Sequence, residues 1–160
     1  MRAAAVEKVD YGALVAALLT APFAVTALIA LPAVLTEGVD YGSLYASLVF
    51  LAISSVYLGG ICYLLLGIPL VLLKLTPADT RPIRFLLICC LANMPSPIIL
   101  YPWLVWIGGA WGPAIAFALY CWIIGFVFAA LWGGMAGVLY HVFRRVIAKA
   151  TQLTRRKDLP

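Results

Sequence analysis

The sequence predicts an all-α membrane protein with four transmembrane helices in two antiparallel hairpins. Of its 160 residues, 66% are hydrophobic and 11% are charged, whereas soluble domains have about 45–50% apolar and about 25% charged residues. The apolar residues form four continuous runs, at about 11–35, 43–73, 83–107 and 113–143. Each run exceeds the roughly 20 apolar residues that a helix needs to cross a bilayer.

The positive charges predict the orientation of these helices. All eleven Lys and Arg residues lie in the segments 1–10, 74–84 and 144–160, which four spans would place on one side of the membrane. The loop at 36–40 has two acidic residues and no cation. Because positive charge is retained on the cytoplasmic side, we expect the N- and C-termini to be cytoplasmic.

The same pattern divides the chain into three parts. A cytoplasmic N-terminus at 1–10 precedes the four-helix domain at 11–143, and a basic amphipathic tail at 144–160 follows it. We expect the tail to bind anionic lipid headgroups, through Arg144, Arg145, Lys149, Arg155, Arg156 and Lys157. Cations placed beside spans argue against nucleic acid as a partner. The expected location is a cell membrane, the bacterial inner membrane.

The first run, 11–35, is expected to form a permanent helix, because the apolar core of a cleaved signal has only about 7–15 residues. It follows the tetrapeptide Val-Asp-Tyr-Gly at 9–12, which recurs at 39–42 before the second run. The repeat marks either two docking sites or two helix starts. In the second interpretation, which we favour, Asp10 and Asp40 accept hydrogen bonds from free backbone N–H groups.

Prolines interrupt the second and third runs. Pro69 lacks a backbone N–H and predicts a bend near the cytoplasmic end of the second helix. The third run is interrupted at Pro102 and, earlier, at Asn93, Pro95, Ser96 and Pro97. In lipid, backbone groups freed at a break must find other partners. The break is therefore either a kink healed by Asn93 and Ser96 or a polar path of the kind found in transporters.

The fourth run has small residues at a spacing of four, which places them on one helix face. They are Gly125, Ala129, Gly133 and Gly137. Small residues let helix backbones approach closely, and the last two form a GxxxG pattern. This small-residue stripe mediates either association with a second copy or another membrane protein, or packing within the same bundle.

The sequence offers no convergent set of catalytic groups. Its four cysteines, Cys62, Cys89, Cys90 and Cys121, all lie within the predicted spans. A vicinal pair can pass a soft metal between thiolates, but no CxxC motif accompanies it, and we expect buried, apolar cysteines. His141 is the single histidine and is expected at the membrane interface. We predict no catalytic residue, no metal site and no cofactor.

Two functions follow from these observations, and neither is enzymatic. Arg84 is the only Lys, Arg, Asp or Glu within the spans, whereas ion-coupled carriers usually bury ionisable residues. The first hypothesis is an accessory, assembly or immunity-type protein that acts by helix–helix contact through the stripe. The alternative is a small oligomeric transporter or channel whose path runs along the broken third helix.

Overall fold

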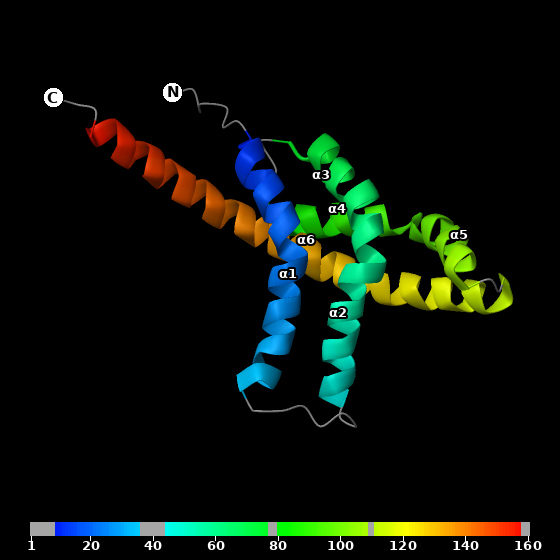
Figure 1. Ribbon diagram of the computed structural model, residues 1–160. Helices are drawn as coiled ribbons and strands as arrows, with labels where there is room; N and C mark the ends of the chain where they lie inside the picture. Colours follow the sequence, from blue (N-terminus) through cyan, green and yellow to red (C-terminus); the bar gives the residue numbers. More distant parts are fainter. Residues whose placement is uncertain (1–8, 36–43, 77–79, 109–110, 158–160) are drawn as a thin grey trace.

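The computed structural model describes residues 9–35, 44–76, 80–108 and 111–157, and every regular element in these ranges is helical. The elements are α1 (Tyr11–Leu35), α2 (Leu44–Cys62), the π-helix η1 (Tyr63–Gly67), α3 (Ile68–Lys74), α4 (Pro82–Asn93), α5 (Ser96–Gly108) and α6 (Trp111–Lys157). The chain is therefore all-α in its described part, as predicted (Figure 1).

Two of these helices are long and apolar enough to cross a membrane, in the ranges Tyr11–Pro32 and Ile115–Gln152. Two further pairs pass the same test together but are bent. Leu44–Tyr57 and Gly59–Lys74 differ in direction by 44°, and Pro82–Asn93 and Ser96–Trp106 by 49°. The described residues thus hold two membrane-spanning candidates, or up to four if each bent pair is one span.

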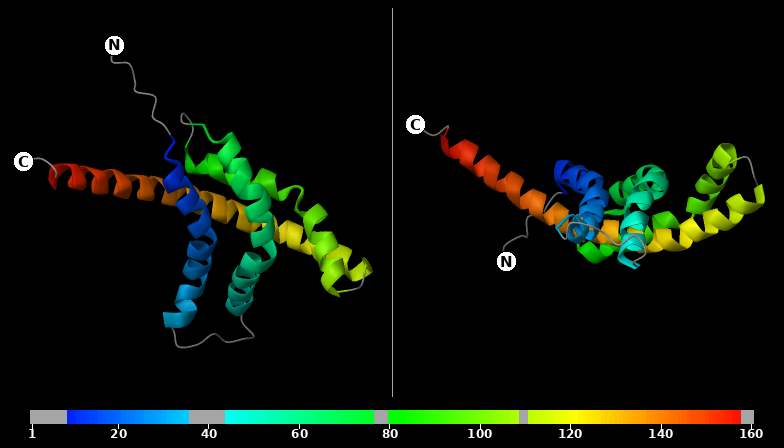
Figure 2. Two further views of the ribbon diagram at one scale, coloured as in Figure 1. Left: turned by 45° about the horizontal axis from the view of Figure 1, so that its top comes forward. Right: turned by 60° about the horizontal axis from the view of Figure 1, so that its bottom comes forward.

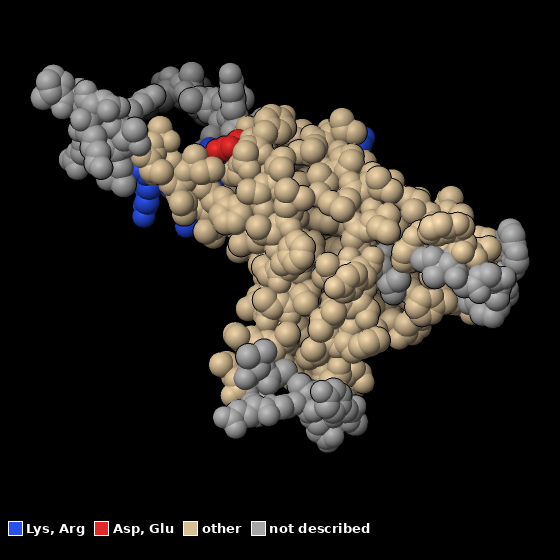
Figure 3. Space-filling model, in the orientation of Figure 1, with Lys and Arg blue, Asp and Glu red and all other residues tan. Residues whose placement is uncertain are grey.

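Helices α1 and α2 cross the direction of α6 obliquely (Figure 1). Helix α1 runs beside α2, whereas α4 and α5 follow α6 in the opposite direction (Figures 1 and 2). The first turn of α1, the last turns of α6 and α3 lie toward the same side of the molecule, at the top of Figure 1. On the face drawn in Figure 3, Lys and Arg side chains of the described residues lie along its upper part, above a wide uncharged surface.

Helix α1 packs on α6 through one face. Ala13, Ala17 and Ala21 on this face are fully buried, because their spacing of four residues aligns them along the helix. Asp10 begins the helix: its Oδ1 accepts a hydrogen bond from the N–H of Ala13 at 3.1 Å. This bond agrees with a helix start at the first Val-Asp-Tyr-Gly copy, at 9–12. The second copy, at 39–42, lies outside the described residues.

The prolines act differently from the expectation at two positions. The second span changes direction by 44° between Tyr57 and Gly59, not at Pro69, where the chain continues from η1 into α3 with helical dihedral angles at Gly67 and Ile68. Directly before it, the N–H of Ile68 donates to the carbonyl of Tyr63, five residues back. The predicted interruption at Pro102 is also wrong, because α5 continues through this residue.

Helix α6 has 47 residues and is therefore about 70 Å long at 1.5 Å per residue. A hydrocarbon core of about 30 Å cannot contain its whole length unless the helix is strongly tilted. The part after His141 extends beyond the bundle as one helix with the rest (Figure 1). At its base, Nε2–H of His141 donates to the carbonyl of Thr80 at 2.9 Å, which fixes the α3–α4 link to α6.

Candidate ligand-binding cavity

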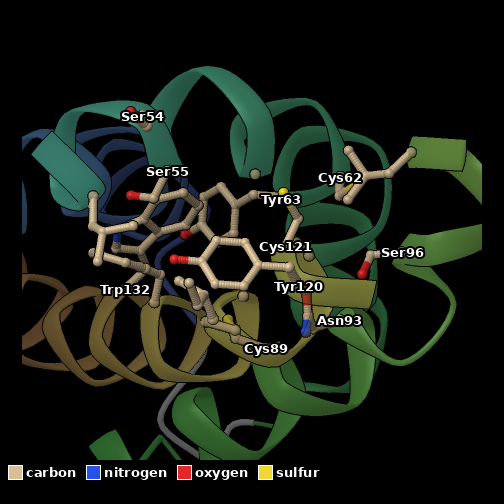
Figure 4. A pocket seen from close by; sticks show the side chains of 18 of the residues that line it. Ser54, Ser55, Cys62, Tyr63, Cys89, Asn93, Ser96, Tyr120, Cys121 and Trp132 are labelled. Atoms are coloured by element: carbon tan, nitrogen blue, oxygen red, sulfur yellow. The ribbon is translucent and has the colours of Figure 1, made fainter. Parts of the chain in front are cut away.

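A cavity of about 600 Å³ lies between α2, η1, α4, α5 and α6 (Figure 4). This volume is within the range of about 300–1,000 Å³ that small-molecule sites occupy. Most of its lining surface is apolar, although eleven of the 23 lining residues have a polar or sulfur atom in the side chain. The polar lining residues are Ser47, Ser54, Ser55, Cys62, Tyr63, Cys89, Asn93, Ser96, Tyr120, Cys121 and Trp132.

The break in the third span contributes to this cavity. Helix α4 ends at Asn93 and α5 begins at Ser96, and both residues line the cavity. Pro95 and Pro97, the other two residues of the predicted path, are not among the lining residues. Pro97 has no N–H to donate to the carbonyl of Asn93, which explains why the helix cannot continue without a bend.

Asn93 connects the break to α6. Its Nδ2 donates to the carbonyl of Trp122 at 3.2 Å. The amide lies directly over Gly125, where an added Cβ would be 2.9 Å from the Asn93 Oδ1. Gly125 therefore provides the space for the amide. Because the bond to Trp122 uses the amide nitrogen, Oδ1 keeps its capacity to accept hydrogen bonds.

Ser96 is 1% exposed, and its Oγ has no hydrogen-bond partner among the described residues. A buried hydroxyl without a partner costs about 1–3 kcal/mol. Figure 4 shows the Ser96 side chain at the edge of the cavity, on the same side as Asn93. Neither side chain bonds to a carbonyl of the third span in the described structure.

Trp132 and Tyr63 form the opposite part of the wall. Trp132 is 3% exposed, and its Nε1 also lacks a partner within the described ranges. The two rings meet edge to face, with centroids 5.2 Å apart. The Tyr63 hydroxyl donates to the carbonyl of Leu18 at 3.0 Å, so the π-helical segment is fixed to α1. Sequence reasoning missed both residues as parts of a site.

The described residues that line the cavity include no Lys, Arg, Asp, Glu or His. A site without charged groups cannot compensate the desolvation of a charged ligand, so this site favours uncharged molecules. Three of the four cysteines, Cys62, Cys89 and Cys121, line the cavity. The described residues contain no group of three His, Cys, Asp or Glu that could hold a metal ion.

Comparisons with protein-family models, curated proteins and solved structures found no match for this chain.

The small-residue stripe faces the interior of the same chain. Gly125 and Ala129 line the cavity. An added Cβ at Gly133 would be 2.7 Å from the Phe85 carbonyl oxygen, and one at Gly137 would be 2.5 Å from the Pro82 Cα. Helix α4 therefore covers the positions that the sequence offered as a partner surface, and the GxxxG pair packs within this bundle.

The tail residues continue along α6 beyond the bundle. Arg145 and Lys149 are exposed, and Arg144 is half-buried. Arg155, Arg156 and Lys157 belong to the last turns of the same helix. Contact with lipid headgroups stays a prediction for all six.

Proposed function

We propose that the protein binds a small uncharged molecule within its membrane-embedded helices, at the break in the third span. The observation that carries the proposal is the cavity itself. It combines Asn93 and Ser96 of the broken span with an apolar wall from α2, η1 and α6, and none of its described lining residues is an acid or a base. Mostly apolar pockets with a few placed polar groups are the usual form of small-molecule sites.

The proposal includes a topology. Both bent pairs act as single spans, so that the chain crosses the bacterial inner membrane four times with its ends in the cytoplasm. The charge pattern supports this orientation. The basic residues at the end of α6 then lie on the cytoplasmic side and contact anionic headgroups.

If the bound molecule is released on the opposite side of the membrane, the protein acts as a transporter or channel. The broken span favours it, because discontinuous helices form the substrate sites of many transporters. An accessory, assembly or immunity-type function stays a prediction. Its partner, whether a second copy or another membrane protein, would need a surface other than the stripe, whose glycines pack on α4.

The proposal is tested by binding of an uncharged fluorescent probe, 1-methylpyrene, to the protein in lipid nanodiscs. As the probe concentration rises, energy transfer from tryptophan should show a saturable component with 1-methylpyrene. The anion 1-pyrenecarboxylate should show no saturable component. Ala46 lines the cavity, and Ala46→Phe should abolish the saturable part by filling the space. The control Ala27→Phe lies on an exposed face of α1 and should bind normally. Equal transfer in both variants would exclude the cavity as the site.

A further inference from the structure

The Ser96 hydroxyl is the most informative polar group of the cavity. It is buried to 1% exposure and has no partner in the described part of the chain. A serine at a helix start usually accepts a hydrogen bond from a backbone N–H of the first turn. Here the next residue, Pro97, has no N–H, and the N–H of Ile98 already donates to the Pro95 carbonyl at 3.0 Å. Neither of the two residues that follow Ser96 therefore offers a free N–H to its hydroxyl.

Asn93 supplies a second, complementary group at the same side of the cavity (Figure 4). Its Nδ2 donates to the Trp122 carbonyl. The amide packs against Gly125, where the absence of a side chain leaves room for it. This leaves Oδ1 as an acceptor, whereas the Ser96 hydroxyl can both donate and accept.

A ligand hydroxyl that reaches both side chains would satisfy both at once. It would donate its proton to the Asn93 Oδ1 and accept a hydrogen bond from the Ser96 Oγ–H. A carbonyl or ether oxygen accepts from Ser96 but leaves the Asn93 acceptor without a donor. The pair therefore selects a hydroxyl over other uncharged oxygen groups.

The other residues of the cavity wall indicate the chemistry of the rest of the ligand. Phe50, Phe117, Phe128 and Trp132 line it together with aliphatic side chains. Such a surface favours an apolar body, and aromatic faces add specific contacts with rings.

We propose that the ligand is an uncharged apolar alcohol or phenol whose hydroxyl lies between Ser96 and Asn93. This inference rests on the proposed function, since it names the class of molecule that the cavity takes. Ser96 and Asn93 determine specificity, and the aromatic wall holds the apolar body.

The test compares 1-hydroxypyrene with 1-methylpyrene, which has a similar shape and no hydroxyl, in the same nanodisc assay. With two added hydrogen bonds, 1-hydroxypyrene should bind about tenfold more tightly to the natural protein. Ser96→Ala and Asn93→Leu should each bring the ratio of the two affinities close to one, because each removes one of the two hydrogen bonds to the hydroxyl. Thr20→Val is the control, because the Thr20 hydroxyl lies on an exposed face of α1 and bonds within its own helix.

A stability measurement on the empty protein separates recognition from a structural role. Removing an unpartnered buried hydroxyl should leave the stability of Ser96→Ala equal to or above that of the natural protein. A clear loss of stability would mean that the hydroxyl has an internal partner and would overturn the inference.

The binding outcomes separate the inference from the proposed function. Equal affinity for the two probes, unchanged in Ser96→Ala, would overturn the hydroxyl preference while the cavity stays a binding site. Absence of saturable binding for both probes would overturn the proposed function together with the inference.

Discussion

The close approach of α4 to α6 gives the sharpest prediction about stability, because neighbouring glycines on α6 should respond with opposite signs. An added Cβ at Gly137 would be 2.5 Å from the Cα of Pro82 and 3.0 Å from its Cβ. At Gly134 an added Cβ would be 4.0 Å from the Leu86 Cδ1. The two alanine variants therefore differ in packing but make the same chemical change.

The magnitude follows from these distances. Carbon contacts are optimal at about 3.5–4.0 Å, so the new methyl of Gly137→Ala overlaps α4 by about 1 Å. The obstructing atom belongs to the backbone, and α4 must shift. Overpacking costs about 1–3 kcal/mol, against a gain of about 1 kcal/mol in helix propensity. We expect Gly137→Ala to lose up to about 2 kcal/mol and Gly134→Ala to gain up to about 1 kcal/mol.

The assay is equilibrium unfolding in mixed micelles, followed by circular dichroism as the fraction of denaturing detergent rises. Opposite shifts of the two midpoints are the expected result. Equal midpoints would refute the close α4–α6 packing. If Gly137→Ala instead weakened self-association or partner binding at unchanged stability, the stripe would serve association between chains.

Three further predictions use the same unfolding assay or the probe assay. Gly125→Ala should displace the Asn93 amide, since its Cβ would lie 2.9 Å from Oδ1, and weaken 1-hydroxypyrene binding about as much as Asn93→Leu. Asp10→Ala should cost about 0.5–2 kcal/mol by removing the cap of α1, whereas Asp10→Asn should restore most of it. Tyr63→Phe should cost about 0.5–1.5 kcal/mol through the lost bond to the Leu18 carbonyl; an unchanged midpoint would show that this bond contributes nothing.

Local chemistry made the broken third span predictable. A proline removes a donor at a known position, so Pro95 and Pro97 indicated where α4 must end. The same rule was wrong at Pro102, through which α5 continues, because a single lost hydrogen bond is tolerated in membrane helices. It was also wrong at Pro69, where a π-helical stretch precedes the proline and the bend lies near Tyr57 instead.

Only part of the candidate site could be predicted, for a related reason. Asn93 and Ser96 stand out in the sequence because polar side chains are rare in an apolar run. Tyr63 and Trp132 do not, because aromatic residues are common in membrane helices. Their place in the cavity depends on contacts between segments nearly 70 residues apart in the chain, which no local pattern encodes.

The stripe and the cavity are two results of one packing arrangement. Helix α4 lies directly on α6 at Gly133 and Gly137, where the absence of side chains permits it. Toward the break the contacts change: the Asn93 amide occupies the space over Gly125, and the 49° bend turns α5 to a new direction. The third span therefore packs more closely on α6 through α4 than through α5, and the cavity lies beside the break between them. The position of α4 on α6 therefore influences the shape of the cavity. A Cβ at Gly137 would contact Pro82 and Phe85, which do not line the cavity. Gly137→Ala should nevertheless lower the probe affinity as well as the stability, because it displaces α4.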